Sequence, residues 1–304
     1  SATNENGGLD HTEPALKMTE ASARWRSQGE ASKAFCGLCI IPKGIKIMKL
    51  FTFATSPYAR KVRIVLDYKG IAYEPLERCY SLDRKEDLRE ANIRAEVPVV
   101  VLDDGRTIAD STIICEYLEQ VYPQPATFPD DPYQRARMRR IEDLCDRTFD
   151  AIGFGYFLGV LRQGEPEAEA IKQAARAECL ALLGVFEREL EAGGEYFCGR
   201  VGLADFAAIC HVPITRAMEI GLDAFPRLAA WSERMRRLPA VAADRTRASK
   251  AWQGVHNIAA EFEGPDGKIH WRDSRLEWPI RHGFGDLVMR EFHAAKMMFP
   301  PDAA

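Results

Sequence analysis

The sequence predicts a small α/β domain followed by an all-helical domain, and three observations lead to this expectation. Short apolar runs rich in β-branched residues alternate with helical periodicity over residues 47–124. A linker studded with prolines follows at residues 125–133. Beyond it, over residues 134–245, apolar side chains recur at helical spacing. A chain of 304 residues is long enough for two domains of ordinary size.

Four strands are expected in the α/β domain. Pro75 indicates that its strand lies at an edge of the sheet, because proline has no N–H to donate to a neighbouring strand. The turn Asp103-Asp104-Gly105 joins the last two strands as a hairpin. The predicted strands span residues 47–53, 71–76, 97–102 and 106–109.

Three helices are expected between and after these strands. Pro57 suits a first helical turn, where its missing N–H would have no partner anyway, and Gly70 is a suitable stop. Ser81 caps a short helix over residues 83–91, and Ser111 caps the third helix. The order strand–helix–strand–helix–strand–strand–helix is the thioredoxin-like order, with a parallel first half and an antiparallel second half.

The helical domain contains a central helix and several helices around it. Residues 203–217 are apolar on nearly all sides, which indicates burial in the middle of the domain. The segment 133–161 is either one long helix or two helices broken at Gly153 and Gly155. Further helices are expected at residues 168–192 and 226–238.

The two ends of the chain fall outside this pattern. Residues 1–46 have little periodicity and are interpreted as a disordered leader, either a tag remnant or an upstream extension, with Met48 as a candidate natural start. Residues 246–304 form an extension in which Trp271 and Trp278 indicate packing on the helical domain. We also expect helical spacing at its end, over residues 286–299, and hypothesise that the extension caps a substrate pocket.

Composition narrows the class of protein. A net charge of −4 argues against a general nucleic-acid binder, and no apolar run approaches the length of a membrane span. The eight cysteines are scattered, mostly within helical patterns, which is typical of reduced thiols in a cytoplasmic protein. Cys36 and Cys39 form a lone pair without the second ligand pair of a zinc site, so no metal is expected.

Four short motifs carry a resemblance to a known family. They are Ser56-Pro57-Tyr58-Ala59-Arg60 after the first strand, Val97-Pro98 before the third strand, Asp110-Ser111 at the third helix, and Gly202-Leu203-Ala204-Asp205 at the buried helix. In this order and at these distances, the chain resembles the cytosolic glutathione transferase superfamily over about residues 47–245. The resemblance implies a thioredoxin-like domain joined to an all-helical domain. It departs from the family pattern at Gly202, where a Ser or Thr usually caps the buried helix.

The resemblance also implies roles for individual residues. The thiol of glutathione, the co-substrate, would lie near Ser56, as in the serine classes of the superfamily. Val97 would offer main-chain hydrogen bonds to the cysteinyl part of glutathione, with Pro98 in the cis form. Asp110 and Ser111 would hold the γ-glutamyl end.

The ionisation of the glutathione thiol explains why a hydroxyl at the start of a helix would assist the reaction. A free thiol with a pKa of ~8.5 is only about 3% ionised at pH 7, whereas the thiolate is the nucleophile. A hydroxyl donor and a helix N-terminus both favour the thiolate, so Ser56 is expected to stabilise it and not to attack anything itself. Thr55 and Tyr58 are rival hydroxyls, and a plain helix cap is the alternative interpretation of Ser56.

The second substrate has several candidate contacts besides Tyr58. Arg135 and Arg139 share a helix face, which is either a solvated face paired with nearby acids or one that turns a guanidinium toward the cleft. In the second case the guanidinium would attract an acidic co-substrate or the glycyl carboxylate of glutathione. Tyr133 and three other aromatic residues either line an apolar pocket or belong to the core; the three are Phe154, Tyr156 and Phe157. His211 and His282 have no evident partner and are expected in the core or on the surface.

The resemblance therefore predicts a cytoplasmic, homodimeric enzyme that conjugates the glutathione thiolate to a small, electrophilic, mostly apolar compound in detoxification. A glutathione-dependent dehalogenase, etherase or isomerase would use the same thiolate. The alternative is a non-catalytic binding or scaffold protein that keeps the fold for interaction. No nucleic-acid or membrane partner is expected.

Overall fold

The computed structural model describes residues 47–77, 86–253 and 269–298. The predicted leader over residues 1–46, with Cys36 and Cys39, lies outside the described residues, and so does the expected cap at Ser81.

The four predicted strands are all present and form one mixed sheet. The strands are β1 (Met48–Thr52), β2 (Tyr73–Glu77), β3 (Val99–Val101) and β4 (Thr107–Ala109), in the spatial order β2-β1-β3-β4. β1 pairs with β2 in parallel and with β3 antiparallel, and β3 pairs with β4 antiparallel. β2 is an edge strand, as Pro75 predicted, and the sheet has the parallel and antiparallel halves of the thioredoxin-like order.

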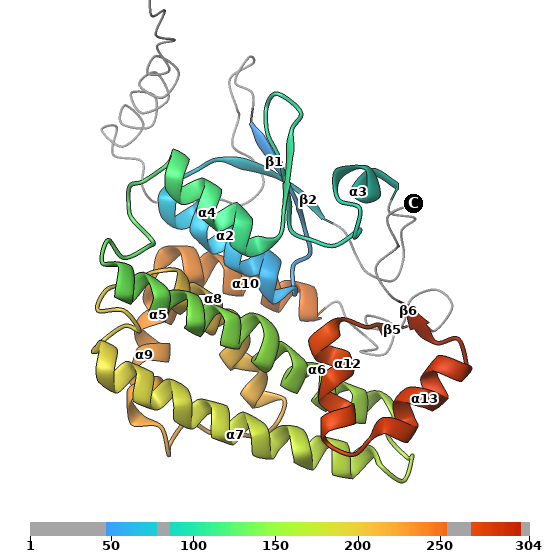
Figure 1. The fold of residues 1–304 in the computed structure, drawn as a ribbon. Coiled ribbons are helices and arrows are strands. Elements are labelled where there is room, and N and C mark those ends of the chain that lie inside the picture. Colours follow the sequence, from blue (N-terminus) through green and yellow to red (C-terminus); the bar gives the residue numbers. More distant parts are fainter. Residues whose placement is uncertain (1–46, 78–85, 254–268, 299–304) are drawn as a thin grey trace, which may run out of the picture. The chain divides into compact units, whose positions relative to one another are not determined.

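The helices of the α/β domain are α2 (Pro57–Lys69), α3 (Glu86–Ala91) and α4 (Ser111–Val121), and α2 and α4 lie side by side (Figure 1). Gly70 ends α2 with a φ of 69°, as predicted. The predicted cap of α4 was wrong by one residue. Asp110, and not Ser111, is the N-cap, because its Oδ1 accepts hydrogen bonds from the backbone N–H groups of Thr112 and Ile113.

The helical part begins with one continuous helical segment that contains no break at the two glycines. It consists of α5 (Pro132–Asp143), the π-helical turn η1 (Leu144–Phe149) and α6 (Asp150–Leu161). Gly153 and Gly155 serve close packing: a Cβ at Gly155 would lie 2.5 Å from the ring of Trp278, and one at Gly153 would lie 2.7 Å from Ile214. The sequence pattern could not distinguish a helix breaker from a packing glycine.

The helices that follow are α7 (Ala168–Gly193), α8 (Leu203–His211), the 3₁₀ helix η2 (Val212–Arg216), α9 (Pro226–Arg237) and α10 (Pro239–Gln253). Every residue of α8 is buried, as predicted for a central helix, but the α-helix ends at His211 and its continuation is 3₁₀. α10 was not anticipated as a separate helix, and it extends past residue 245 into the segment assigned to the C-terminal extension.

The start of α8 explains the glycine at position 202. The carboxylate of Asp205 accepts hydrogen bonds from the backbone N–H of Gly202 (3.0 Å) and from Trp231 Nε1 (2.7 Å). A Cβ at Gly202 would lie only 2.6 Å from the carbonyl oxygen of Thr127, which accepts a hydrogen bond from Leu203 N at 3.0 Å. The missing side-chain cap is therefore offset by a close backbone contact that only glycine permits.

The C-terminal extension contains β5 (Ile269–His270), α12 (Asp273–Arg281), α13 (Gly285–His293) and β6 (Met297–Met298), and α12 packs against α6 (Figure 1). The helix expected over residues 286–299 is present as α13, but it already ends at His293. α12 was not predicted. Trp271 and Trp278 are buried, with the Trp271 ring edge-on to Phe154. The extension is thus part of the folded core.

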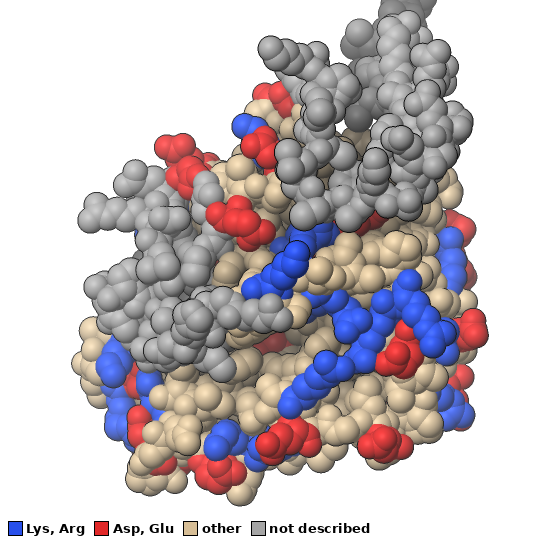
Figure 2. Space-filling model, turned by 180° about the vertical axis from the view of Figure 1, so that it is seen from behind, with Lys and Arg blue, Asp and Glu red and all other residues tan. Residues whose placement is uncertain are grey.

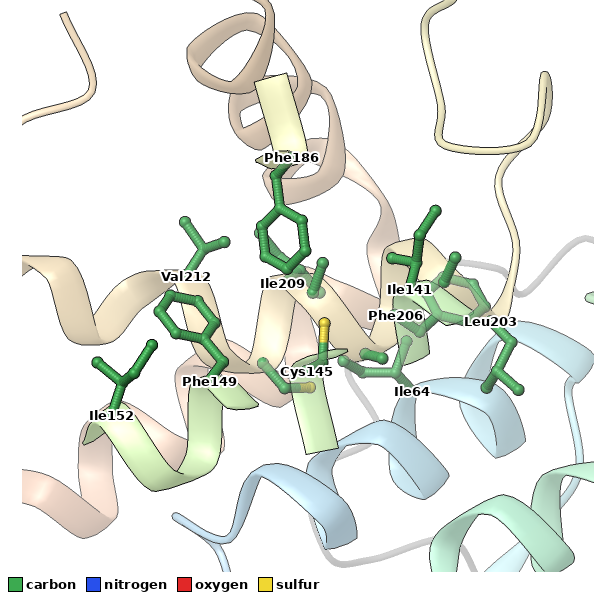
Figure 3. Close-up of a cluster of buried hydrophobic side chains, with 14 of the residues drawn as sticks. Ile64, Ile141, Cys145, Phe149, Ile152, Phe186, Leu203, Phe206, Ile209 and Val212 are labelled. Atoms are coloured by element: carbon green, nitrogen blue, oxygen red, sulfur yellow. The ribbon is translucent and has the colours of Figure 1, made fainter. Parts of the chain in front are cut away.

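The hydrophobic core continues from the α/β domain into the helical domain. Figure 3 shows Ile64 of α2 close to Phe206 of α8, with Cys145 and Phe149 of η1 in the same cluster. Buried ion pairs cross the same boundary: Asp244 of α10 bonds Arg60 Nε at 2.8 Å and Arg63 Nε at 2.9 Å. Apolar packing and paired charges together fix how the two domains meet.

Candidate functional site

A cleft of about 690 Å³ lies where the α/β domain, η1 and the start of α12 come together. This volume is in the range of small-molecule sites. Six of the predicted site residues line it, and they come from four separate stretches of the sequence: Tyr58, Val97, Pro98, Asp110, Ser111 and Arg139.

The Val97-Pro98 step forms one wall of the cleft. The peptide bond between these residues is cis, and Val97 is buried. Pairing of β3 with β1 begins at Val99, so the backbone groups of Val97 stand just before the ladder. Such groups can bond a peptide ligand that lies along the strand end.

Asp110 and Ser111 lie at the N-terminus of α4. Asp110 has a φ of 78°, which is uncommon for a residue other than glycine and occurs preferentially at functional sites. Its Oδ1 caps the helix, and Ser111 is nearly fully buried next to it. A helix N-terminus attracts carboxylates, whereas the carboxylate of Asp110 attracts an ammonium group.

The three candidate hydroxyls differ in their positions. Ser56 is 5% exposed, its Oγ accepts a hydrogen bond from Ala59 N at 3.4 Å, and neither it nor Thr55 is among the residues that line the cleft. Tyr58 does line the cleft, but its hydroxyl donates to the backbone oxygen of Asp146 at 2.7 Å. Burial raises the pKa of Tyr58 well above its ordinary value, so this phenol is neutral at physiological pH.

The other predicted contacts separate into two groups. Arg139 lines the cleft and pairs with Glu142 at 2.6 Å and with Glu116. Arg135 lies elsewhere, because its Nε donates to the backbone oxygen of Pro129 at 3.1 Å. Tyr133 is 70% exposed and does not line the cleft, while Phe154 and Tyr156 belong to the core.

A buried lysine supports the floor of the cleft, and sequence reasoning missed it. Lys61 Nζ lies 2.7 Å from Glu142 Oε1 and 2.5 Å from Asp146 Oδ2. Burial alone would lower the pKa of Lys61, but Asp146 and Glu142 raise it above its ordinary value. Lys61 therefore stays charged and bonds two acids that line the cleft, which offsets one of their two negative charges.

The two histidines both have carboxylate neighbours. His211 stacks on Phe149, with its Nε2 3.8 Å from Asp146 Oδ1, and His282 Nε2 lies 2.8 Å from Glu178 Oε2. Since the first is buried and the second packs on Trp278, both fit the expected structural positions.

The opening residues of α12 form the wall of the cleft that no sequence motif indicated. Arg272, Asp273 and Ser274 all line it. The guanidinium of Arg272 lies 4.7 Å from the centre of the Tyr58 ring, and its Nε bonds Glu96 Oε1 at 3.1 Å. The only signal in the sequence was the pair of tryptophans around this segment.

Positive charge also gathers away from the cleft. Figure 2 shows Lys and Arg side chains across the middle of the face opposite to that of Figure 1. Arg245 has neighbours of like charge in Arg216 and Arg236, and Arg236 pairs with Glu233 at 2.8 Å. Arg216, Arg236 and Arg245 do not line the cleft.

No group of three or more His, Cys, Asp or Glu side chains among the residues that the structure describes could hold a metal ion. No described helix is both long enough and apolar enough to cross a bilayer.

Comparisons with known proteins agree on one family. Residues 50–126 match the family model of the glutathione S-transferase N-terminal domain, and residues 169–234 match that of the C-terminal domain. Maleylacetoacetate isomerase from Pseudomonas aeruginosa is 32% identical over 185 residues, which are 60% of this chain and 87% of the relative. A probable glutathione S-transferase from Zea mays, BZ2, is 30% identical over 64% of this chain and 88% of its own length.

Solved structures extend this similarity to three dimensions. A glutathione S-transferase from Methylobacterium radiotolerans, in complex with glutathione sulfonate, superposes with a TM-score of 0.57 and 29% identity. The match covers 65% of this chain and 93% of that structure.

Proposed function

Because the chain belongs to the cytosolic glutathione transferase superfamily, we propose that it is an enzyme that stabilises the glutathione thiolate for attack on a small, electrophilic, mostly apolar compound. The observation that carries this proposal is the convergence of Val97, Pro98, Asp110 and Ser111 on one cleft. These residues are the ones that the family pattern assigns to glutathione.

The cleft offers complementary groups for each part of a γ-glutamyl tripeptide. The backbone of Val97 can bond the cysteinyl peptide unit, since it lies just before the paired part of β3. Asp110 keeps Oδ2 available for an ammonium group, because the cap bonds use Oδ1. Ser111 and the N-terminus of α4 suit the neighbouring carboxylate.

Ser56 would act on the sulfur through its hydroxyl proton. Its Oγ accepts the Ala59 N–H, which leaves the O–H free to donate. Lowering the thiol pKa by about two units requires about 2.7 kcal/mol of differential stabilisation, which a hydroxyl donor and the N-terminus of α2 would share. Ser56 is the N-cap of α2 and is only 5% exposed, so the sulfur of glutathione would have to reach its hydroxyl at the first turn of that helix.

The reaction class and the assembly belong to the same proposal. Dehalogenation, ether cleavage and isomerisation would use the same thiolate, and the isomerase from Pseudomonas aeruginosa favours keeping isomerisation among them. We further propose a cytoplasmic homodimer that acts in detoxification. The exposed apolar side chains Ile113 and Val121 of α4 and Tyr133 of α5 are available for the dimer contact, which light scattering would test.

Retention on immobilised glutathione, together with turnover of a chloro-aromatic electrophile, tests the proposal. Binding with turnover supports the enzyme. Binding without turnover across a panel of halides, ethers and cis-alkenes would support the non-catalytic alternative, a glutathione-binding scaffold. Absence of both would reject a role for glutathione.

Ser56→Ala tests the assigned hydroxyl. We expect turnover to fall by a factor of about 10² or more, with little change in glutathione affinity. Asp131→Ala is the matched control, because Asp131 caps α5 ahead of Pro132 just as Ser56 caps α2 ahead of Pro57, and it lies outside the cleft. If both variants kept full turnover, the Ser56 assignment would be wrong, and Thr55→Ala and Tyr58→Phe would be tested next.

A further inference from the structure

The start of α12 closes the cleft from a part of the chain that neither matched family range includes. The family models match residues 50–126 and 169–234, whereas Arg272, Asp273 and Ser274 line the cleft together with Val97 and Pro98. This wall is therefore a feature of this chain beyond the matched domains.

The wall is firmly held. Arg275 makes two hydrogen bonds to the buried Asp150, at 2.8 and 2.9 Å. Trp278 is buried against Gly155 and donates from Nε1 to Glu178 Oε2 at 2.6 Å. With the next turn of α12 anchored in this way, Arg272 has a defined position in the cleft.

Arg272 is one of two guanidinium groups that share a single carboxylate. Arg272 Nε bonds Glu96 Oε1 at 3.1 Å, and Arg94 Nε bonds Glu96 Oε2 at 3.0 Å. The three side chains together carry a formal charge of +1. Arg94 and Glu96 precede the Val97-Pro98 step in the sequence, and all three line the cleft with it. A planar guanidinium is the side chain best suited to binding a carboxylate.

A further arginine lines the same cleft. Arg147 of η1 is exposed and forms no ion pair with any residue that the structure describes. Two of the acids that line the cleft, Glu142 and Asp146, bond Lys61, and Asp143 and Asp273 line it as well. The π-helical turn places both Asp146 and Arg147 at the cleft, with Asp146 bonded to Lys61.

We propose that Arg272, with Arg94 and Arg147, forms a carboxylate-binding subsite that the C-terminal extension adds to the cleft. The inference rests on the proposed use of glutathione. The carboxylate comes either from the glycyl end of glutathione or from an acidic second substrate, and the two sources can be distinguished by experiment.

The test uses the full chain with Arg272→Ala and measures glutathione binding by calorimetry, beside the glycyl ethyl ester of glutathione. If the subsite holds the glycyl carboxylate, the Kd for glutathione should rise about tenfold while the Kd for the ester stays unchanged. If it holds the second substrate, the KM should rise about tenfold for an electrophile that carries a carboxylate, and not for its neutral ester.

Three further variants complement Arg272→Ala. Arg290→Ala removes an exposed arginine of the same extension that pairs with Glu165 and Glu167, and it should change none of these constants. Glu96→Gln should tighten carboxylate binding, because it removes an acid that competes for Arg272, whereas a purely structural bridge would be weakened. If Arg272→Ala failed to fold, Arg147→Ala would be measured in its place.

Two different results would contradict the proposal: one rejects the proposed function as well, and the other rejects only the subsite. Wild-type protein that binds no glutathione would reject the proposed function and the subsite with it. Wild-type protein that binds glutathione, with Arg272→Ala equal to wild type towards both pairs of ligands, would reject the subsite alone.

Discussion

The two sides of the cleft are built in different ways. The sheet side consists of a strand start and a helix start, Val97-Pro98 and Asp110-Ser111, which β3 and β4 bring together through a short hairpin. The extension side depends on side chains that bond partners more than 100 positions away: Arg272, which lines the cleft, bonds Glu96, and Arg275, which anchors α12 behind it, bonds Asp150.

This difference predicts which side of the cleft depends more on single side chains. Backbone groups at the end of a strand and at a helix N-terminus keep their positions as long as the sheet is folded. Side-chain bridges keep theirs only while both charged partners are present, and their contribution depends on how deeply they are buried. The extension side should therefore be the more sensitive to single substitutions and to pH.

Arg275→Ala should have the largest effect. Asp150 is 7% exposed, and its carboxylate would remain buried without the guanidinium that bonds both of its oxygens. Breaking a buried pair by removing one partner costs about 3–5 kcal/mol. Urea unfolding should show this loss, and the double variant Arg275→Ala/Asp150→Ala should recover part of it. A loss below about 1 kcal/mol would mean that the extension does not depend on this pair.

Gly155→Ala should come next. A Cβ at this position would lie 2.5 Å from the ring of Trp278, so either the indole or α12 must shift, at a cost of about 1–3 kcal/mol. Gly184→Ala is the matched control within a helix, because its Cβ would meet only Arg188 at 3.6 Å. That control should stabilise the protein by up to about 1 kcal/mol. Opposite signs of the two changes in Tm would confirm the prediction, and equal changes would contradict it.

The Arg275–Asp150 pair should also make the extension sensitive to acid. Burial alone would raise the pKa of Asp150, but Arg275 lowers it from its ordinary value of 3.8 to about 2. A carboxyl group whose pKa is lower in the folded state stabilises the protein above the unfolded pKa, and this stability is lost as the pH falls from about 4 to about 2. The loss attributable to Asp150 is about 2 kcal/mol.

Comparison of wild type with Asp150→Asn measures this contribution. Unfolding curves at pH 6, 4 and 3 should show a steeper decline for the wild type, since the amide does not titrate. Parallel curves would mean that Asp150 has the same pKa in the folded and unfolded states.

The same contrast explains how much of the molecule the sequence could predict. The four strands, the helix at Pro57 and the buried helix after Gly202 follow local periodicity and turn residues, so they were found with boundaries wrong by a few residues. Val97-Pro98 and Asp110-Ser111 could be singled out because each motif is local and the family pattern fixes their order. Both motifs line the cleft, and their role in binding glutathione stays a prediction.

The remainder depends on contacts that are distant in sequence. Whether Gly155 breaks a helix or packs inside one could not be predicted, because its partner, Trp278, lies 123 positions further along the chain. Lys61 looked like an ordinary helix residue, although it is buried between two acids of the helical domain. Arg272 belonged to no motif, and only the docking of α12 brings it to Glu96.

Arg290→Ala should have the smallest effect of these substitutions. Arg290 belongs to the same extension as Arg275 and pairs with Glu165 and Glu167, but its side chain is 53% exposed. Water and salt screen an exposed pair, and ordering a long side chain offsets what attraction remains. We therefore expect the Tm of Arg290→Ala to match that of wild type in 0.15 M salt. A decrease comparable to that of Arg275→Ala would contradict the distinction between buried and exposed bridges, and would mean that α13 anchors the extension.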